Sequence, residues 1–228
     1  MTEMLDVYDA NRRMIGVADR NVVHNAGLWH KTVHCWVAIT SGPGKHWMVF
    51  QRRARKIDNN PGKLYTTASG HVSAGESLTD AFAREIHQEI GIDVAIAPDC
   101  RDVEFFYETV WVADISKTDG TPFIDRVFAN VYCARFENSV RILVDDLDFW
   151  RQFHFDDGEV DSLVAIRTDD FIGLCDDVRV DITGMEWNGV NVREIKLTAG
   201  DFVVNAGETL EGKYKRIADL INLGGYVN

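Results

Sequence analysis

Residues 77–90 constrain the fold more than any other segment, because they combine an amphipathic helical pattern with a boundary signal at each end. At about 100° per residue, their large apolar side chains fall on one arc that has to face a core. These side chains are Leu78, Phe82, Ile86 and Ile90. Ser77 can cap the N-terminus with Asp80 three residues on, and Gly91 stands where a glycine usually ends a helix. The segment predicts a helix packed on the core of a globular domain.

Two carboxylates of this segment project onto the apolar arc or its margin. Glu89 falls inside the arc, and Glu85 lies along one margin with Gln88. Because Glu85 and Glu89 are four residues apart, their Cβ atoms are neighbours at ~5–6 Å, and at an effective dielectric of ~20 they repel by roughly 3 kcal/mol. A hard cation such as Mg²⁺ would offset this repulsion. Arg84 is an alternative counter-charge, although it projects away from the acidic margin, and a solvated helix edge is a third explanation.

The rest of the chain alternates apolar and polar residues in the manner of strands, with two further helices. Strands are expected over 4–9, 14–19, 32–39, 47–52, 65–68, 103–114, 125–136 and 159–167, and a hairpin over 178–197. Helices are expected over 168–175 and 208–223. These elements predict an α/β or α+β sandwich with a mixed sheet. Without a visible linker, residues 1–228 are expected to form one domain, with an N-terminal hairpin (1–29), a core (about 30–175) and a C-terminal extension (176–228).

Acidic residues outnumber Lys and Arg by 36 to 24, which gives a formal net charge of −12. This excess argues against a nucleic-acid partner and a basic membrane-binding surface, but it suits recruitment of cations that bind a phosphorylated small molecule. The first twenty residues have no apolar signal-peptide core, and no apolar run is long enough to cross a bilayer. The four cysteines lack metal-site spacing. We therefore expect a cytoplasmic protein with no membrane partner, and a homodimer remains open.

The run 70–92, GHVSAGESLTDAFAREIHQEIGI, places two glycines before the helix, where the backbone can curl and present polar groups to a ligand. It resembles the Nudix box, and the positions in register are Gly70, Glu76, Arg84, Glu85, Ile86, Glu89, Gly91 and Ile92. The resemblance implies an α/β/α sandwich in which this run forms a loop, a helix and a loop. It also implies bound Mg²⁺ or Mn²⁺ and hydrolysis of a diphosphate linkage in a small nucleoside-diphosphate-type or related compound.

The resemblance to the box also implies roles for individual residues. Glu85 and Glu89 would be the principal metal ligands and catalytic carboxylates, with Glu76 supporting them and the carbonyl of Gly70 joining the ligands. Gln88 departs from the pattern, which has a glutamate there. An amide oxygen at Gln88 can bind a hard cation but supplies no charge, so metal affinity should fall. A module that keeps the fold and binds a ligand without turnover is therefore the alternative to a hydrolase.

A second resemblance covers about residues 5–92 and is to the Nudix-fold branch that contains isopentenyl-diphosphate isomerase. In the isomerase, three histidines bind a divalent metal, and His24, His30 and His71 stand at similar places. Each of them is alternatively a loop histidine, and His71 is also a candidate for lining the substrate pocket. The resemblance thus implies a possible second metal site or pocket.

Two positions depart from the isomerase. Ser69 stands where the isomerase has its catalytic cysteine, and its second acidic dyad is missing near residues 124–126. Isomerisation needs a matched acid and base across the double bond, and a serine hydroxyl has too high a pKa for that role. We therefore reject the isomerase activity.

The remaining candidates are charged residues outside the box. Arg53 falls where the isomerase-like branch has a diphosphate-binding arginine, and Lys56 is nearby, although a solvated basic loop explains both equally well. Arg84 is expected to pair with a carboxylate and so fix the box. A general base often comes from a later loop in this family, and Asp156, Asp157 or Glu159 could supply it; the sequence does not choose among them.

Overall fold

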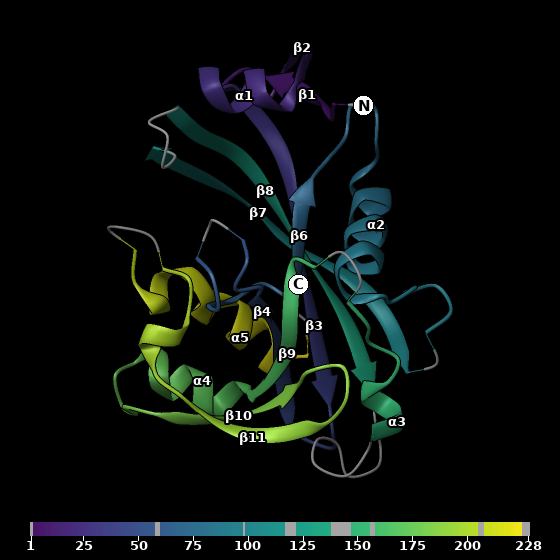
Figure 1. Cartoon of the computed structure of the whole chain (residues 1–228), viewed down its shortest axis with the longest axis vertical. Coiled ribbons are helices and arrows are strands. Elements are labelled where there is room, and N and C mark those ends of the chain that lie inside the picture. Colours follow the sequence, from purple (N-terminus) through teal and green to yellow (C-terminus); the bar gives the residue numbers. More distant parts are fainter. Residues whose placement is uncertain are drawn as a thin grey trace. The chain divides into compact units, whose positions relative to one another are not determined.

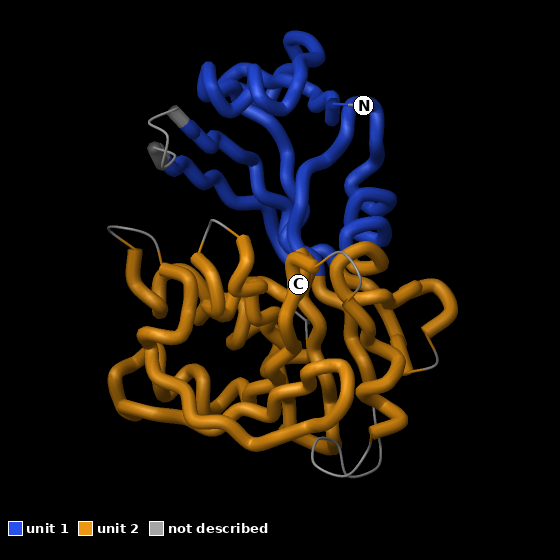
Figure 2. Tube along the Cα trace, in the orientation of Figure 1, with its two compact units in different colours: residues 1–34, 69–85, 105–132 blue, residues 35–68, 86–104, 133–228 orange. Residues whose placement is uncertain are grey.

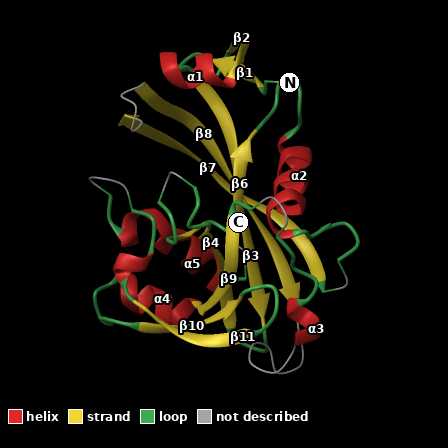
Figure 3. Cartoon of the chain, viewed as in Figure 1, coloured by secondary structure: helices red, strands yellow, loops and turns green. Residues whose placement is uncertain are grey.

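The computed structural model describes residues 2–57, 60–97, 99–116, 122–137, 147–155, 158–204 and 208–224. Strands and helices are shown in Figures 1 and 3. The strands are β1 (Met4–Tyr8), β2 (Met14–Asp19), β3 (Trp29–Thr40), β4 (His46–Arg53), β5 (Leu64–Tyr65), β6 (Ala68–His71), β7 (Cys100–Ser116), β8 (Pro122–Glu137), β9 (Val160–Arg167), β10 (Ile182–Trp187) and β11 (Val192–Leu197). The helices are α1 (Arg20–Ala26), α2 (Leu78–Ile90), α3 (Leu147–Trp150), α4 (Thr168–Cys175), the 3₁₀ turn η1 (Ala199–Asp201), the π-helical turn η2 (Glu211–Lys215) and α5 (Arg216–Asn222).

The chain forms two compact units (Figure 2). The first contains Met1–His34, Ser69–Glu85 and Phe105–Tyr132, and the second contains Cys35–Ala68, Ile86–Glu104 and Cys133–Asn228. Strands β3, β6, β7 and β8 and helix α2 contribute residues to both units. Among the described residues, no helix combines the length and apolar composition that a membrane span needs.

The first unit begins with an antiparallel hairpin of β1 and β2, and β1 also pairs with β3. These strands confirm the predictions for residues 4–9 and 14–19. Helix α1 follows at once, because the Asp19 carboxylate caps it by accepting from the amide of Asn21 at 2.8 Å. Gly27 ends the helix with a φ of 61°. Helix α1 was not predicted, because its seven residues are too few to establish a helical period.

The core of the second unit is a sheet with the strand order β11-β10-β9-β4-β3, in which neighbouring strands are antiparallel. Successive residues of β4 point to opposite faces of this sheet. On one face Phe50 packs against Phe171 of α4 and Tyr214 of η2. On the other face Gln51 hydrogen-bonds to Glu89 of α2. Helices therefore cover both faces of β4, and the predicted α+β sandwich is confirmed.

Helix α2 begins and ends close to the predicted residues. The amide of Asp80 donates to the hydroxyl of Ser77 at 3.1 Å, and that hydroxyl donates to the Asp80 carboxylate at 2.7 Å. Gly91 has a φ of 72°. A Cβ at Gly91 would also lie only 2.5 Å from the ring of His154. Both the backbone conformation and the available space therefore require glycine at this helix end.

The C-terminal elements also follow the predictions, with differences in detail. Helix α4 has the predicted bounds, and β10 and β11 form the predicted hairpin, in which the amides of Val190 and Asn191 donate to the side chain of Asn188. The apolar stripe of the last helix is buried, but its first turn is the π-helical η2 rather than an α-helix. The strand predicted over 65–68 is two short strands, β5 and β6, and α3 was not predicted.

Candidate functional site

Arg84 ties helix α2 to the loop that precedes it. Its guanidinium makes two parallel bonds to Glu76, Nε to Oε1 at 2.8 Å and Nη2 to Oε2 at 2.9 Å. Nη2 also donates to the backbone carbonyl of His71 at 2.8 Å, and the amide of Ser73 donates to Glu76 at 2.9 Å. The bonds from Arg84 hold the pKa of Glu76 below its usual range. Arg84 thus makes the bidentate carboxylate pair expected from the sequence, and this pair fixes the loop.

Glu85 is a buried carboxylate at the start of the helix's second half. It is 8% exposed, and burial raises its pKa. A Cβ on Gly70 would collide with the Glu85 carboxylate, which therefore lies directly against the glycine backbone. Nη1 of Arg84 donates to Oε1 of Glu85 at 2.5 Å. The helical projection placed Arg84 away from the acidic margin, but its long side chain reaches back and neutralises Glu85.

Glu89, one helical turn further on, is 6% exposed and belongs to the second unit. Its Oε2 accepts a hydrogen bond from Nε2 of Gln51 at 2.6 Å, and Gln51 is itself only 2% exposed. Gln51 was not predicted as a site residue, although a lone amide that follows Met48, Val49 and Phe50 in a buried strand was an available signal. Gln51 fixes the orientation of the Glu89 carboxylate.

Gln88, the residue that departs from the Nudix pattern, is exposed, as is His87 beside it. Glu85 and Glu89 are buried on the same helix. The helical projection placed Gln88 and Glu85 along the same margin of the apolar arc. In the structure the two side chains differ, because Glu85 is buried and Gln88 is exposed to solvent. A role of Gln88 in metal binding stays a prediction.

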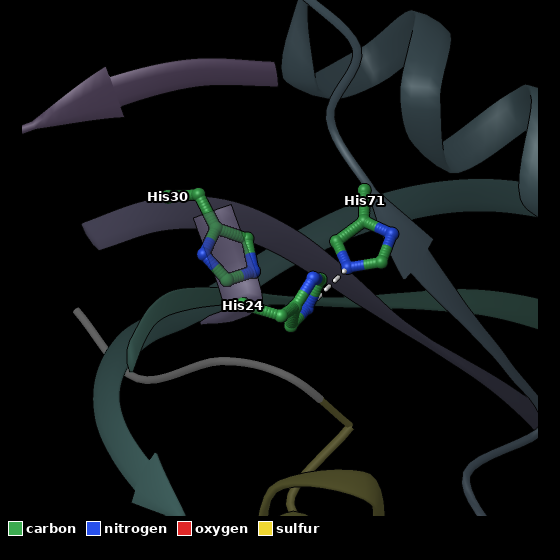
Figure 4. Close-up of side chains that lie close together, drawn as sticks. All are labelled: His24, His30 and His71. Atoms are coloured by element: carbon green, nitrogen blue, oxygen red, sulfur yellow. Dashed lines mark hydrogen bonds between the residues drawn. The ribbon is translucent and has the colours of Figure 1, made fainter. Parts of the chain in front are cut away.

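Three histidines from separate elements of the first unit meet in a cluster (Figure 4). His24 comes from α1, His30 from β3 and His71 from β6. One ring nitrogen of each lies within 4.8 Å of the others. Nε2 of His71 is 3.3 Å from Nε2 of His24. His24 and His30 are buried, and His71 is half-buried. The histidines that the sequence named from a resemblance are therefore adjacent in space.

The outer nitrogen of each ring is held by an acceptor, as in protein metal sites. Nδ1 of His24 lies 2.7 Å from the carbonyl oxygen of Arg20, and Nδ1 of His30 lies 3.1 Å from that of Leu28. Nδ1 of His71 lies 3.5 Å from the carboxylate of Glu3. With a metal bound, donation from Nδ1–H to these acceptors would leave a lone pair on each Nε2, the nitrogen that faces the cluster. Without a metal, the hydrogen bond between the Nε2 atoms of His71 and His24 requires a hydrogen on one of the two. Burial lowers the pKa of His24 to about 4, which favours this neutral form.

Asp125 of β8 adds a carboxylate to the cluster. Its Oδ1 lies 3.3 Å from Nε2 of His30 and 3.7 Å from Nε2 of His24. Oδ1 of Asp125 and Nε2 of His30 are buried, and neither has a hydrogen bond within the described part of the chain. Burial opposes ionisation of Asp125, whereas imidazoles that are protonated, or that carry their hydrogen on Nε2, lower its pKa below the usual range. A metal ion on the Nε2 atoms would stabilise the carboxylate in the same way. The acidic dyad of the isomerase is absent from residues 124–126, as the sequence indicates, but Asp125 by itself adds a carboxylate to the histidine cluster, which the sequence did not predict.

The other predicted residues lie in the second unit or outside the described residues. The guanidinium carbon of Arg53 lies 5.8 Å from the centre of the Tyr65 ring. The ammonium of Lys56 lies against the backbone of Gly158, where a Cβ would collide with it. Glu159 is exposed, and its backbone carbonyl accepts from the amide of Ala54 at 2.7 Å. Asp156 and Asp157 lie outside the described residues, so the choice of general base stays a prediction.

Comparison with known proteins connects this geometry to a family. An uncharacterized Nudix hydrolase of Clostridium acetobutylicum is 41% identical over 91 residues, which are 40% of this chain and 43% of that protein. The uncharacterized Nudix hydrolase YfcD of Escherichia coli is 32% identical over 126 residues, 54% of this chain and 67% of the relative. The match thus spans less than half of the first relative. Both relatives are named as hydrolases, in agreement with the prediction of an enzyme.

A structure of DR0079 from Deinococcus radiodurans aligns with 96% of this chain and 99% of its own, at 16% identity and a TM-score of 0.49. The sequence profile of the NUDIX domain matches residues 30–170, which is more than half of the chain and includes the run from Gly70 to Ile92. The chain therefore belongs to the NUDIX domain family.

Proposed function

We propose that this protein is a hydrolase that depends on a divalent metal and cleaves a diphosphate linkage in a small nucleoside-diphosphate-type or related compound. The observation that carries the proposal is that α2 bears two buried carboxylates, Glu85 and Glu89, one helical turn apart. Burying two acids on one helix is unfavourable unless positive charge balances them. Arg84 donates to Glu85 but also pairs with Glu76, and the amide of Gln51 brings no charge to Glu89, so a divalent cation would supply the positive charge that is still needed. Membership of the NUDIX domain family supports the same function.

The residues of the box fit a hard divalent cation. Carboxylate and backbone carbonyl oxygens are the donors that Mg²⁺ and Mn²⁺ prefer. Glu85 lies against the backbone of Gly70, so oxygen donors from both residues are available at one place. Such a cation neutralises diphosphate oxygens and lowers the pKa of a bound water molecule. Glu85 and Glu89 would hold it.

Five other side chains would position the substrate and the metal ligands. The Arg84–Glu76 pair holds the loop that follows β6, the strand that carries Gly70. Gln51 orients the Glu89 carboxylate. Arg53 and Lys56 would bind the diphosphate oxygens, since cations at the end of β4 complement a polyanion.

A second divalent cation is proposed for the histidine cluster of the first unit. Its donors are Nε2 of His24, His30 and His71 together with Oδ1 of Asp125. Three imidazoles and one carboxylate suit a transition metal such as Zn²⁺ or Mn²⁺ better than Mg²⁺. The acceptors behind each ring support this assignment, because they orient the rings and fix their tautomers.

The test is turnover of a panel of diphosphate compounds with Mg²⁺ or Mn²⁺, for the wild type and for Glu89→Gln. Release of phosphate or nucleotide that requires the metal and is lost in Glu89→Gln would support the hydrolase. A folded, metal-loaded protein that binds diphosphate compounds but turns none of them over would overturn it in favour of a ligand-binding module. Exchange of the double-bond position of isopentenyl diphosphate would instead reverse the rejection of isomerase activity, which rests on Ser69.

A further inference from the structure

Lys213 is a largely buried cation supplied by the C-terminal segment, outside the residues 30–170 that match the family. Its side chain is 13% exposed, and its Nζ lies 3.2 Å from Oε2 of Glu208. Lysine is rarely buried to this extent without a partner of opposite charge, and here that partner is Glu208. Lys213 also lies on the π-helical turn η2, a rare backbone geometry that is frequent at functional sites. These features set Lys213 apart from an ordinary surface lysine.

The Tyr65 ring brings Lys213 close to a predicted substrate-binding arginine. Nζ of Lys213 lies 5.4 Å from the centre of the Tyr65 ring, and the guanidinium carbon of Arg53 lies 5.8 Å from the same centre. Both distances are within the ~6 Å at which a cation is attracted to an aromatic face. Two cations, one from β4 and one from the C-terminal segment, therefore gather around one aromatic side chain in the second unit.

The Tyr65 side chain projects from the face of the sheet on which Gln51 contacts Glu89 of α2. Tyr65 of β5 stands directly opposite Gln51 of β4 in an antiparallel pair. Side chains of such opposed residues project from the same face, with Cβ atoms ~4.5–5.5 Å apart. Gln51 in turn holds the carboxylate of Glu89. A short series of contacts within the second unit thus joins Lys213 to the proposed metal-binding carboxylate.

We propose that Lys213 is a substrate-binding residue that, together with Arg53, binds the phosphate oxygens of the diphosphate compound. The proposal rests on the function proposed above and adds a residue that the family match does not contain. An ammonium group has three donors and a compact charge, which suits it to phosphate oxygens. Glu208 competes for the same ammonium, so its carboxylate would weaken the binding that Lys213 provides. A purely structural Lys213–Glu208 ion pair is the alternative explanation.

The first experiment measures binding of methylenediphosphonate, a diphosphate analogue that cannot be hydrolysed at its bridge, by calorimetry with Mg²⁺ present. Lys213→Met keeps the length of the side chain and removes the charge. We expect affinity to fall about tenfold, the size of one lost charged hydrogen bond, and Lys213→Arg to restore most of it. Lys215→Met is the matched control, because Lys215 lies on the same turn and pairs with Asp176. It should leave affinity unchanged.

A second variant changes affinity in the opposite direction. Glu208→Gln removes the competing carboxylate and should strengthen methylenediphosphonate binding a few-fold. If Lys213→Met does not fold, this variant tests by itself whether Lys213 binds the analogue. In turnover assays Lys213→Met should raise KM about as much as it weakens the analogue while kcat changes less than about twofold, the pattern of lost ground-state binding.

Unchanged analogue affinity in both Lys213→Met and Glu208→Gln would overturn the proposal and leave a structural ion pair. This failure differs from failure of the hydrolase proposal. Analogue binding that depends on Lys213 without any turnover would sustain the Lys213 site and reject the hydrolase.

Discussion

The histidine cluster and the carboxylates of α2 offer a cation opposite kinds of donors. The cluster presents imidazole nitrogens whose rings are fixed from behind by backbone carbonyls and a carboxylate. The helix presents hard oxygens from Glu85 and Glu89, held by Arg84 and Gln51. Imidazole suits transition metals, whereas carboxylate oxygens suit Mg²⁺. We therefore expect the two groups to bind different metals, and a substitution in one group should leave metal binding by the other unchanged.

Glu89→Gln tests the carboxylate group and has the largest expected effect. Loss of a proposed metal ligand should lower kcat/KM with Mg²⁺ by at least about 100-fold, more than the 10–100-fold typical of residues behind the ligands. The measurement is metal-dependent release of phosphate, with Glu194→Gln, at an exposed position of β11, as the control. Glu89→Gln should keep the full Zn²⁺ content of the histidine cluster. Loss of that Zn²⁺ together with activity would show that the two groups are not separate sites.

Asp125→Asn tests the histidine cluster. The neutral amide keeps the shape of the side chain and removes its charge, so the affinity of the cluster for Zn²⁺ should fall by about 10–100-fold. Equilibrium dialysis with metal analysis measures this directly. His30→Gln should abolish the Zn²⁺ site, while His87→Gln, at an exposed position of α2, should not change it. If both Asp125→Asn and His30→Gln bound Zn²⁺ as tightly as the wild type, the histidine cluster would not be a metal site.

Glu76→Gln tests whether an ion pair fixes the box when no metal is bound. Replacing the carboxylate should lower the free energy of unfolding by about 1.5–3 kcal/mol at pH 7, the range for hydrogen bonds to charged groups. Because the pKa of Glu76 lies below its usual value of 4.5, the pair stabilises the fold fully above that pH. The difference between the proteins should then shrink as the pH falls through the lowered pKa. Denaturant unfolding with a metal chelator present, at several pH values, measures it; a difference independent of pH would exclude the charge as its cause.

Gln51→Leu tests the donor behind Glu89. Removing the buried amide leaves Oε2 of Glu89 without this donor, and we expect Mg²⁺ affinity to fall about tenfold. Titration of activity against Mg²⁺ measures the change. Gln152→Leu alters a half-buried glutamine that bonds to the carbonyl of Phe149, and it is the control. Equal losses in the two variants would point to general destabilisation rather than to orientation of Glu89.

The two groups also differ in how far the sequence predicts them. The box is continuous in sequence, so the period of α2, its caps at Ser77 and Gly91, and the burial of Glu89 all follow from local pattern. The partner of Glu89 does not, because Gln51 reaches it only through the packing of β4 on the helix. The projection also failed for Arg84, whose long, flexible side chain can turn back to a neighbour on its own helix.

The histidine cluster depends on contacts between distant segments. No local pattern relates His24 to His71, and only a family resemblance connected them. Asp125 escaped notice because sheet pairing brings β8 to β3, and a single aspartate in a strand carries no signal of its own. Lys213 is a third case, since a helical period assigns it to the edge of an amphipathic helix but does not predict that its side chain reaches Tyr65.

Gln88→Glu has the smallest expected effect, and it adds a carboxylate to α2 instead of removing one. It restores the carboxylate of the Nudix pattern beside Glu89 and should raise Mg²⁺ affinity, because charge on the ligands raises affinity for a hard cation. Gln88 is exposed, so solvent screens the added charge and the gain should be only a few-fold. Activity titrated with Mg²⁺ measures it, and His87→Glu, equally exposed one residue earlier, is the matched control. An equal gain in His87→Glu would mean that any added negative charge on α2 suffices, whereas a gain confined to Gln88→Glu would place position 88 within reach of the cation.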